Sequence, residues 1–154
     1  RYASYANLAR EVRRRFDAPE RTLHELFARI TFSIIVGNTD DHARNHAAFW
    51  DGASLTMTPA YDICPQPRSG GEATQAMAIG DDGWRYSQLA GCVERAGIYR
   101  LSPGEARGII DNQLSTVRRN WQEVCDLAGL SQVDRAWFWG RQFLNPYCLY
   151  GYVT

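Results

Sequence analysis

Apolar side chains recur at helical spacing near the start of the chain. Over residues 5–16 they lie three or four positions apart, with arginines on the opposite face, which predicts an amphipathic helix. Pro19 interrupts this pattern. Thr22 and Glu25 have the spacing of a capping box, so we expect a second, strongly apolar helix to begin there and to end at Gly37.

A β-hairpin and an irregular segment are predicted next. The segments 46–50 and 54–58 flank an Asp-Gly pair at 51–52, which favours the positive φ angles of a tight turn. Residues 65–83 are rich in Pro, Gly, Ser and Asp, and within them only 76–79 has the composition of a short strand. The hairpin therefore separates two polar segments.

The second half of the chain has helical patterns. A helix over 85–96 is expected to stop at Gly97, and the cap at 102–105 begins a long helix that ends near Leu127. Ser131 begins a last helix. The aromatic residues in and after that helix are expected to be buried: Trp137, Phe138 and Phe143. We therefore expect a mainly α fold, a helical bundle with one small β-hairpin.

Composition and charge restrict the classes of protein that fit. The 154 residues suit a single domain over 1–154. The 17 basic and 17 acidic residues balance, so there is no general basic field and we expect no direct nucleic-acid binding. One helix carries a local run of arginines, which a solvated face explains: Arg10, Arg13, Arg14 and Arg15.

The cysteines and the apolar runs point to a cytoplasmic protein. The four cysteines lack the close spacings of a zinc site, which indicates reduced thiols. No apolar run is long enough to span a membrane and no signal sequence is visible, so we expect no membrane contact.

The polar segment between the second helix and the hairpin carries the candidate chemistry. It reads Gly-Asn-Thr-Asp-Asp-His-Ala-Arg-Asn from Gly37 to Asn45, and Pro-Ala-Tyr-Asp ends at Asp62 after the hairpin. Asp40 and Asn45 have the Asp-x-x-x-x-Asn spacing of the protein-kinase catalytic loop. There the aspartate accepts the proton of the substrate hydroxyl and the asparagine holds a metal. Asp62 lies where the second, magnesium-binding aspartate belongs.

Each polar residue of this segment also has a structural explanation. Such residues cap helices and close turns, and Asp41 is a rival base, although it is only four residues from Asn45. His42 either orients the base or lies at the surface, and Arg44 either pairs with a phosphate or is solvated. His46 is expected to pack. The whole set is more specific than any member, so we favour the chemical interpretation.

This set of motifs resembles the carboxy-terminal part of HipA-type serine/threonine kinases, the toxins of bacterial toxin–antitoxin pairs, most firmly over residues 26–63. The resemblance implies a protein-kinase-like C-lobe in which Asp40 is the catalytic base and His42 orients it. It implies that Asn45 and Asp62 bind Mg²⁺ and thereby the phosphoryl donor ATP. It also implies a protein substrate, such as a translation component, and a DNA-binding antitoxin as partner.

The resemblance is incomplete in one respect. A complete kinase also needs an amino-terminal lobe with a Gly-rich phosphate loop and a lysine that pairs with the nucleotide phosphates. This chain has no lysine and no such loop, so we expect a fragment that is nearly inactive by itself. Two alternatives stay open: a noncatalytic module that binds an antitoxin or another protein, and a lipid or small-molecule kinase with the same loop.

Overall fold

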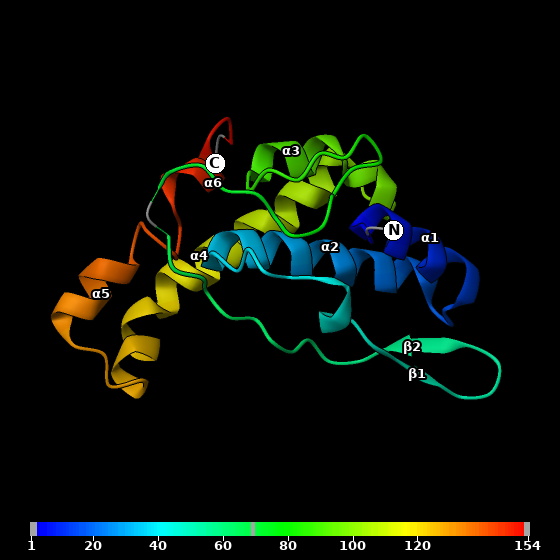
Figure 1. Cartoon of the computed structure of the whole chain (residues 1–154), viewed down its shortest axis with the longest axis horizontal. Coiled ribbons are helices and arrows are strands. Elements are labelled where there is room, and N and C mark those ends of the chain that lie inside the picture. The colour runs from blue at the N-terminus through cyan, green and yellow to red at the C-terminus, as the bar shows by residue number, and fades with distance from the viewer. Residues whose placement is uncertain (1–2, 69, 153–154) are drawn as a thin grey trace.

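The helix α2 (Pro19–Val36) runs through the middle of the molecule and contacts both α1 (Tyr5–Arg15) and α4 (Pro103–Leu127) (Figure 1). This computed structural model describes residues 3–68 and 70–152. The apolar side chains of α2 form the centre of the core, where several are no more than 1% exposed: Leu26, Phe27, Ile30, Ile34 and Ile35. The first two predicted helices are confirmed.

The start of α2 differs from its prediction. Pro19 occupies the first helical position, where its missing N–H costs no hydrogen bond. The predicted capping box is wrong because Thr22 and Glu25 already lie inside the helix. The Thr22 hydroxyl donates to the Ala18 carbonyl oxygen at 2.8 Å, and Glu25 pairs with Arg29 one turn later.

Gly37 ends α2 in the left-handed conformation that the sequence predicts, with a φ of 76°. A Cβ added there would lie 2.5 Å from the Gln142 carbonyl oxygen, so the missing side chain also lets the C-terminal segment approach. The Leu144 N–H donates to the Ile35 carbonyl oxygen at 2.8 Å and fastens that segment. The loop after Gly37 therefore starts from a fixed point.

The predicted hairpin is present, but its turn is longer than the sequence suggests. The strands β1 (Ala48–Trp50) and β2 (Leu55–Met57) pair antiparallel and are joined by a four-residue loop. Gly52 has a φ of 101°, while the Asp51 carboxylate accepts hydrogen bonds from two backbone N–H groups of the loop, each at 2.8 Å. This hairpin extends from the helical part of the molecule near α1 (Figure 1).

The region between the hairpin and α4 is less regular than predicted. Helix α3 (Leu89–Glu94) is shorter than expected, and the chain continues as a 3₁₀ helix, η2 (Ala96–Tyr99). The segment 76–79 makes only an isolated bridge to Ser4, because its end closes a local turn over residues 79–84 instead of pairing as a strand.

The C-terminal helices are predicted well in position and poorly in burial. Ser102 and Glu105 form the predicted capping box of α4. No residue of α5 (Gln132–Phe138) is buried, and Trp137 is 54% exposed. This helix extends past the core in Figure 1, whereas α6 (Pro146–Leu149) lies beside α3. Two further aromatic residues are only partly buried: Phe138 and Phe143.

The mainly helical fold with one two-stranded hairpin is the predicted one. Within residues 3–68 and 70–152, no helix is both long and apolar enough to cross a membrane.

Candidate functional site

The polar loop that follows α2 is fixed by backbone hydrogen bonds. Asn38 is 2% exposed, and its N–H donates to a carbonyl oxygen in the last turn of α2 at 2.8 Å. The Thr39 carbonyl oxygen accepts a hydrogen bond from the Ala76 N–H at 3.0 Å. The loop closes with a single 3₁₀ turn, η1 (Ala43–Asn45), before β1. Both ends of the loop therefore have defined positions.

Asn45 and Asp62 meet although the hairpin separates them in sequence. The side-chain Nδ2 of Asn45 lies 2.7 Å from Oδ2 of Asp62. Asn45 is 5% exposed, whereas Asp62 is exposed to solvent. One residue earlier in each segment, the Tyr61 hydroxyl donates to the Arg44 carbonyl oxygen at 2.7 Å. The structure thus brings together the two residues that the sequence predicts as metal ligands.

Asp62 has an unusual backbone. Its φ of 57° lies in the left-handed region, which glycine adopts readily and aspartate tolerates better than most residues. This conformation costs an L-residue about 1–2 kcal/mol. Backbone strain of this kind concentrates at functional sites, where the surrounding structure holds it in place. The position of the Asp62 carboxylate is therefore specified by its loop.

The two adjacent aspartates of the loop differ in their surroundings. Asp40 is exposed and accepts no hydrogen bond from any described residue. Asp41 is 5% exposed, and its Oδ2 accepts a hydrogen bond from the Tyr5 hydroxyl at 2.6 Å. Nε2 of His46 lies 3.1 Å from Oδ1 of Asp41. Asp41, the rival base, is engaged on the inner side of the loop, and Asp40 is the carboxylate that a substrate can reach.

His42 is half-buried, and its Nδ1 has no hydrogen-bond partner in the described part of the chain. No hydrogen bond there joins it to Asp40, so its role in orienting the base stays a prediction. The sequence predicts packing for His46, and for Tyr5 only a place on the apolar face of the first helix. The only local sequence signal that could have indicated the pair of Asp41 and His46 is its spacing. These two residues are five apart, as are Asp40 and Asn45.

The donor atoms at this loop fit magnesium. Mg²⁺ prefers oxygen ligands and usually takes only one or two carboxylates, with water and substrate phosphates in the other positions. Asp62 supplies an exposed carboxylate, and the buried Asn45 donates its Nδ2 N–H to that carboxylate, which leaves its amide oxygen as the possible ligand. Among the described residues, no group of three or more His, Cys, Asp or Glu side chains could hold a metal by itself. A site at Asn45 and Asp62 would thus need substrate oxygens to be complete.

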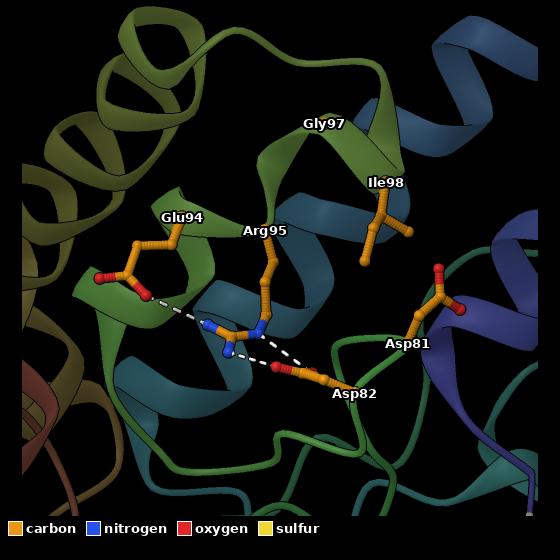
Figure 2. Close-up of a pocket in the computed structure, with 6 residues that line it drawn as sticks. All are labelled: Asp81, Asp82, Glu94, Arg95, Gly97 and Ile98. Carbon is orange, nitrogen blue, oxygen red and sulfur yellow. Dashed lines mark hydrogen bonds and ion pairs between the residues drawn. The ribbon is translucent and has the colours of Figure 1, made fainter.

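A pocket remote from the loop in sequence is lined by charged side chains that form ion pairs (Figure 2). This pocket of about 480 Å³ lies between the turn at 81–82 and the end of α3. The Arg95 guanidinium lies 2.6 Å from an Asp82 oxygen and 3.2 Å from a Glu94 oxygen. It also lies 4.4 Å from the centre of the Trp84 ring. The third carboxylate of the pocket, Asp81, pairs with Arg10 of α1, so each charged side chain of the lining has a partner and we interpret this pocket as structural.

Comparison with known proteins identifies the family. The search of curated proteins finds no match. The HipA-like C-terminal domain family matches residues 1–121, which include the loop, the hairpin and Asp62. Residues 122–154, with α5 and α6, lie outside the matched region. The family is related to kinases and, in general, to toxin–antitoxin proteins. The match covers well over half of the chain, which therefore belongs to the HipA-like C-terminal domain family.

Proposed function

We propose that this chain supplies the catalytic loop and the metal ligands of a HipA-like serine/threonine kinase. The observation that carries the proposal is the contact of 2.7 Å between Asp62 and Asn45, which lies on the same loop that exposes Asp40. Two residues that are 17 apart in sequence thus meet in space, as a shared metal site requires.

The proposed reaction transfers the γ-phosphoryl group of ATP to a protein hydroxyl. Asp40 hydrogen-bonds the hydroxyl and accepts its proton as the oxygen attacks the γ-phosphorus. The bond from that phosphorus to the bridging oxygen breaks, and ADP leaves with the bonding electrons. Asn45 and Asp62 would hold Mg²⁺, which when bound would neutralise charge on the phosphates. Catalysis by these residues is mainly positioning and electrostatic stabilisation.

The nucleotide also needs residues that this chain does not contain. All 17 of its basic residues are arginines, so the lysine that pairs with the phosphates in kinases would come from another part of the protein. The proposed acceptor, a protein hydroxyl such as one of a translation component, and the proposed DNA-binding antitoxin rest on the family alone. We propose a cytoplasmic location on the same basis.

Titration calorimetry with Mg-ATP tests the nucleotide part of the proposal. We expect the full-length protein to bind, and the 154-residue chain not to bind measurably. Asp62→Ala in the full-length protein should weaken Mg-ATP binding and leave ATP binding in EDTA unchanged. If neither form of the wild-type protein binds, the proposal fails.

A noncatalytic binding module is the second candidate, and the absence of lysine favours it. Failure of both forms to bind nucleotide, together with capture of the antitoxin, would support it. Analysis of the phosphorylated product separates a protein kinase from a lipid or small-molecule kinase with the same loop.

A further inference from the structure

Two buried side chains of the catalytic loop contact each other, and each directly follows a proposed functional residue in the sequence. Asp41 and His46 directly follow Asp40 and Asn45, the proposed base and metal ligand. Nε2 of His46 lies 3.1 and 3.2 Å from the two Asp41 oxygens, and both side chains are no more than 7% exposed. The contact therefore joins the middle of the loop to its end, on the side away from solvent.

Tyr5 connects this contact to the helical body. It is fully buried at the start of α1, and its hydroxyl donates to Asp41 Oδ2 at 2.6 Å. Its N–H donates to the Ala78 carbonyl oxygen at 2.9 Å. Its ring meets the His46 ring edge to face, with the centroids 5.8 Å apart. The Asp41 carboxylate is thus held from two directions.

The chemistry of the three groups suits a permanent contact. Burial, and then the charge of Asp41, raise the pKa of Tyr5 well above its usual value, so the phenol keeps its proton and donates. Nε2 of His46 lies within hydrogen-bond distance of both Asp41 oxygens, so the histidine ring is the second group that contacts this carboxyl group. Hydrogen bonds to a buried charged group contribute more than neutral ones and are costly to lose.

We propose that Tyr5, Asp41 and His46 form a clamp of positioning residues that sets the separation and direction of Asp40 and Asn45. The proposal rests on the proposed kinase function. Neighbouring residues of an extended chain point to opposite sides, so holding Asp41 inward directs Asp40 outward. His46 directly follows Asn45, the last residue of the 3₁₀ turn η1 and itself only 5% exposed, so holding His46 fixes the end of that turn. A loop that shifts by about 1 Å can lose about 100-fold in rate, so a clamp at this place affects turnover.

The test compares two buried tyrosines in the full-length protein. Tyr5→Phe removes only the hydroxyl that holds Asp41. Tyr99→Phe is the matched control, because Tyr99 is also fully buried and its hydroxyl donates to the Ile79 carbonyl oxygen at 2.9 Å, away from the loop. We expect Tyr5→Phe to lower kcat by at least about tenfold, with little change in the KM for ATP. Tyr99→Phe should leave kcat unchanged.

Hydrogen exchange gives a readout that does not depend on activity. Backbone amides of residues 39–46 should exchange faster in Tyr5→Phe than in Tyr99→Phe, with or without Mg-ATP. A second pair of variants tests the other arm of the clamp. His46→Gln keeps a side-chain N–H near the position of Nε2, so it should retain more activity than His46→Ala.

Asp40→Ala separates this proposal from the function on which it rests. If Asp40→Ala still transfers phosphate at the wild-type rate, the proposed function is wrong, and hydrogen exchange alone then decides about the clamp. If Asp40→Ala is inactive while Tyr5→Phe and Tyr99→Phe have the same kcat and the same exchange rates, only the clamp is overturned. Equal activity of His46→Gln and His46→Ala would also contradict it.

Discussion

The side chains of Asn45 and Asp62 lie 2.7 Å apart because the hairpin between them brings its two flanks back to one place. The Thr58 N–H donates to the Ala47 carbonyl oxygen at 3.0 Å, which extends the pairing beyond the strands toward both residues. A hairpin is the shortest way to return a chain to its starting point with a defined register. Its place in this protein is between the two proposed metal ligands.

Asp62→Asn tests the role of the carboxylate without changing the shape of the side chain. Asparagine also tolerates the left-handed backbone, so the variant should unfold at nearly the wild-type temperature. In the full-length protein it should lose phosphate transfer and require more Mg²⁺ for ATP binding. Asp126→Asn, on the distant part of α4, is the control. Equal Mg²⁺ dependence of the two variants would exclude Asp62 as a ligand.

Gly37→Ala should destabilise the fold by about 1–3 kcal/mol or more, because it combines a positive φ with a close approach to the Gln142 backbone. Gly108→Ala on α4 is the matched control, since nothing lies within 4 Å of the added Cβ. That change should stabilise the protein by about 0.5–1 kcal/mol. Urea unfolding of the 154-residue chain measures both. A neutral Gly37→Ala would contradict the packing of the C-terminal segment on α2.

Local sequence signals predict much of this fold. The capping box of Ser102 and Glu105 and the end of α2 at Gly37 are correct, because each depends on residues close together in the chain. The predicted cap at Thr22 is wrong because Pro19 can begin a helix as well as interrupt one. The exposure of Trp137 depends on how far α5 extends beyond the core, which periodicity does not encode.

The candidate site likewise has one part that local sequence patterns predict and one part that they do not. The spacing of Asp40, Asn45 and Asp62 is a local pattern, and the structure places the last two in contact. Tyr5 could not be found from sequence, because 36 residues separate it from Asp41. Its position depends on the packing of α1 against α2, a long-range consequence of the core.

Cysteine reactivity provides a test of the tertiary structure. Burial raises the pKa of Cys92 and of Cys148 to about 12, so both thiols stay protonated near neutral pH. Cys125 is also buried, and Cys64 is exposed next to the proposed metal site. Iodoacetamide at pH 8 should modify Cys64 first and the others only after unfolding in urea, as measured by mass spectrometry. Rapid modification of Cys92 in the native protein would contradict the described core.

The ion pair of Asp82 and Arg95 predicts a dependence of stability on pH. The hydrogen bond from the Arg95 guanidinium lowers the pKa of Asp82 below its usual value. A carboxyl group whose pKa falls on folding stabilises the protein above its unfolded pKa of about 3.9, and this contribution is lost as the pH falls through the folded pKa. Asp82→Asn should therefore lower stability at pH 7, with a smaller effect near pH 3.

Urea unfolding at several pH values checks this prediction. As a control, the effect of Asp82→Asn is measured again in a protein that also carries Arg95→Met. Without the guanidinium, the pH-dependent effect of Asp82→Asn should be smaller, because only the hydrogen bond from the Trp84 N–H then remains, of these two, to lower the pKa of Asp82. A pH-dependent effect of the same size in that background would show that the guanidinium does not lower the pKa of Asp82.

The most direct test of the central claim is phosphate transfer from γ-labelled ATP by the full-length protein, compared with its Asp40→Asn variant. The exposed Asp40 carboxylate is the proposed base, and the variant replaces it with an amide of the same shape that cannot accept the proton. We expect the wild-type protein to label a serine or threonine hydroxyl and Asp40→Asn to lose at least about 100-fold in rate, with an unchanged unfolding temperature and unchanged Mg-ATP binding. Equal rates of labelling in the two proteins would contradict the assignment of this loop as a phosphoryl-transfer site.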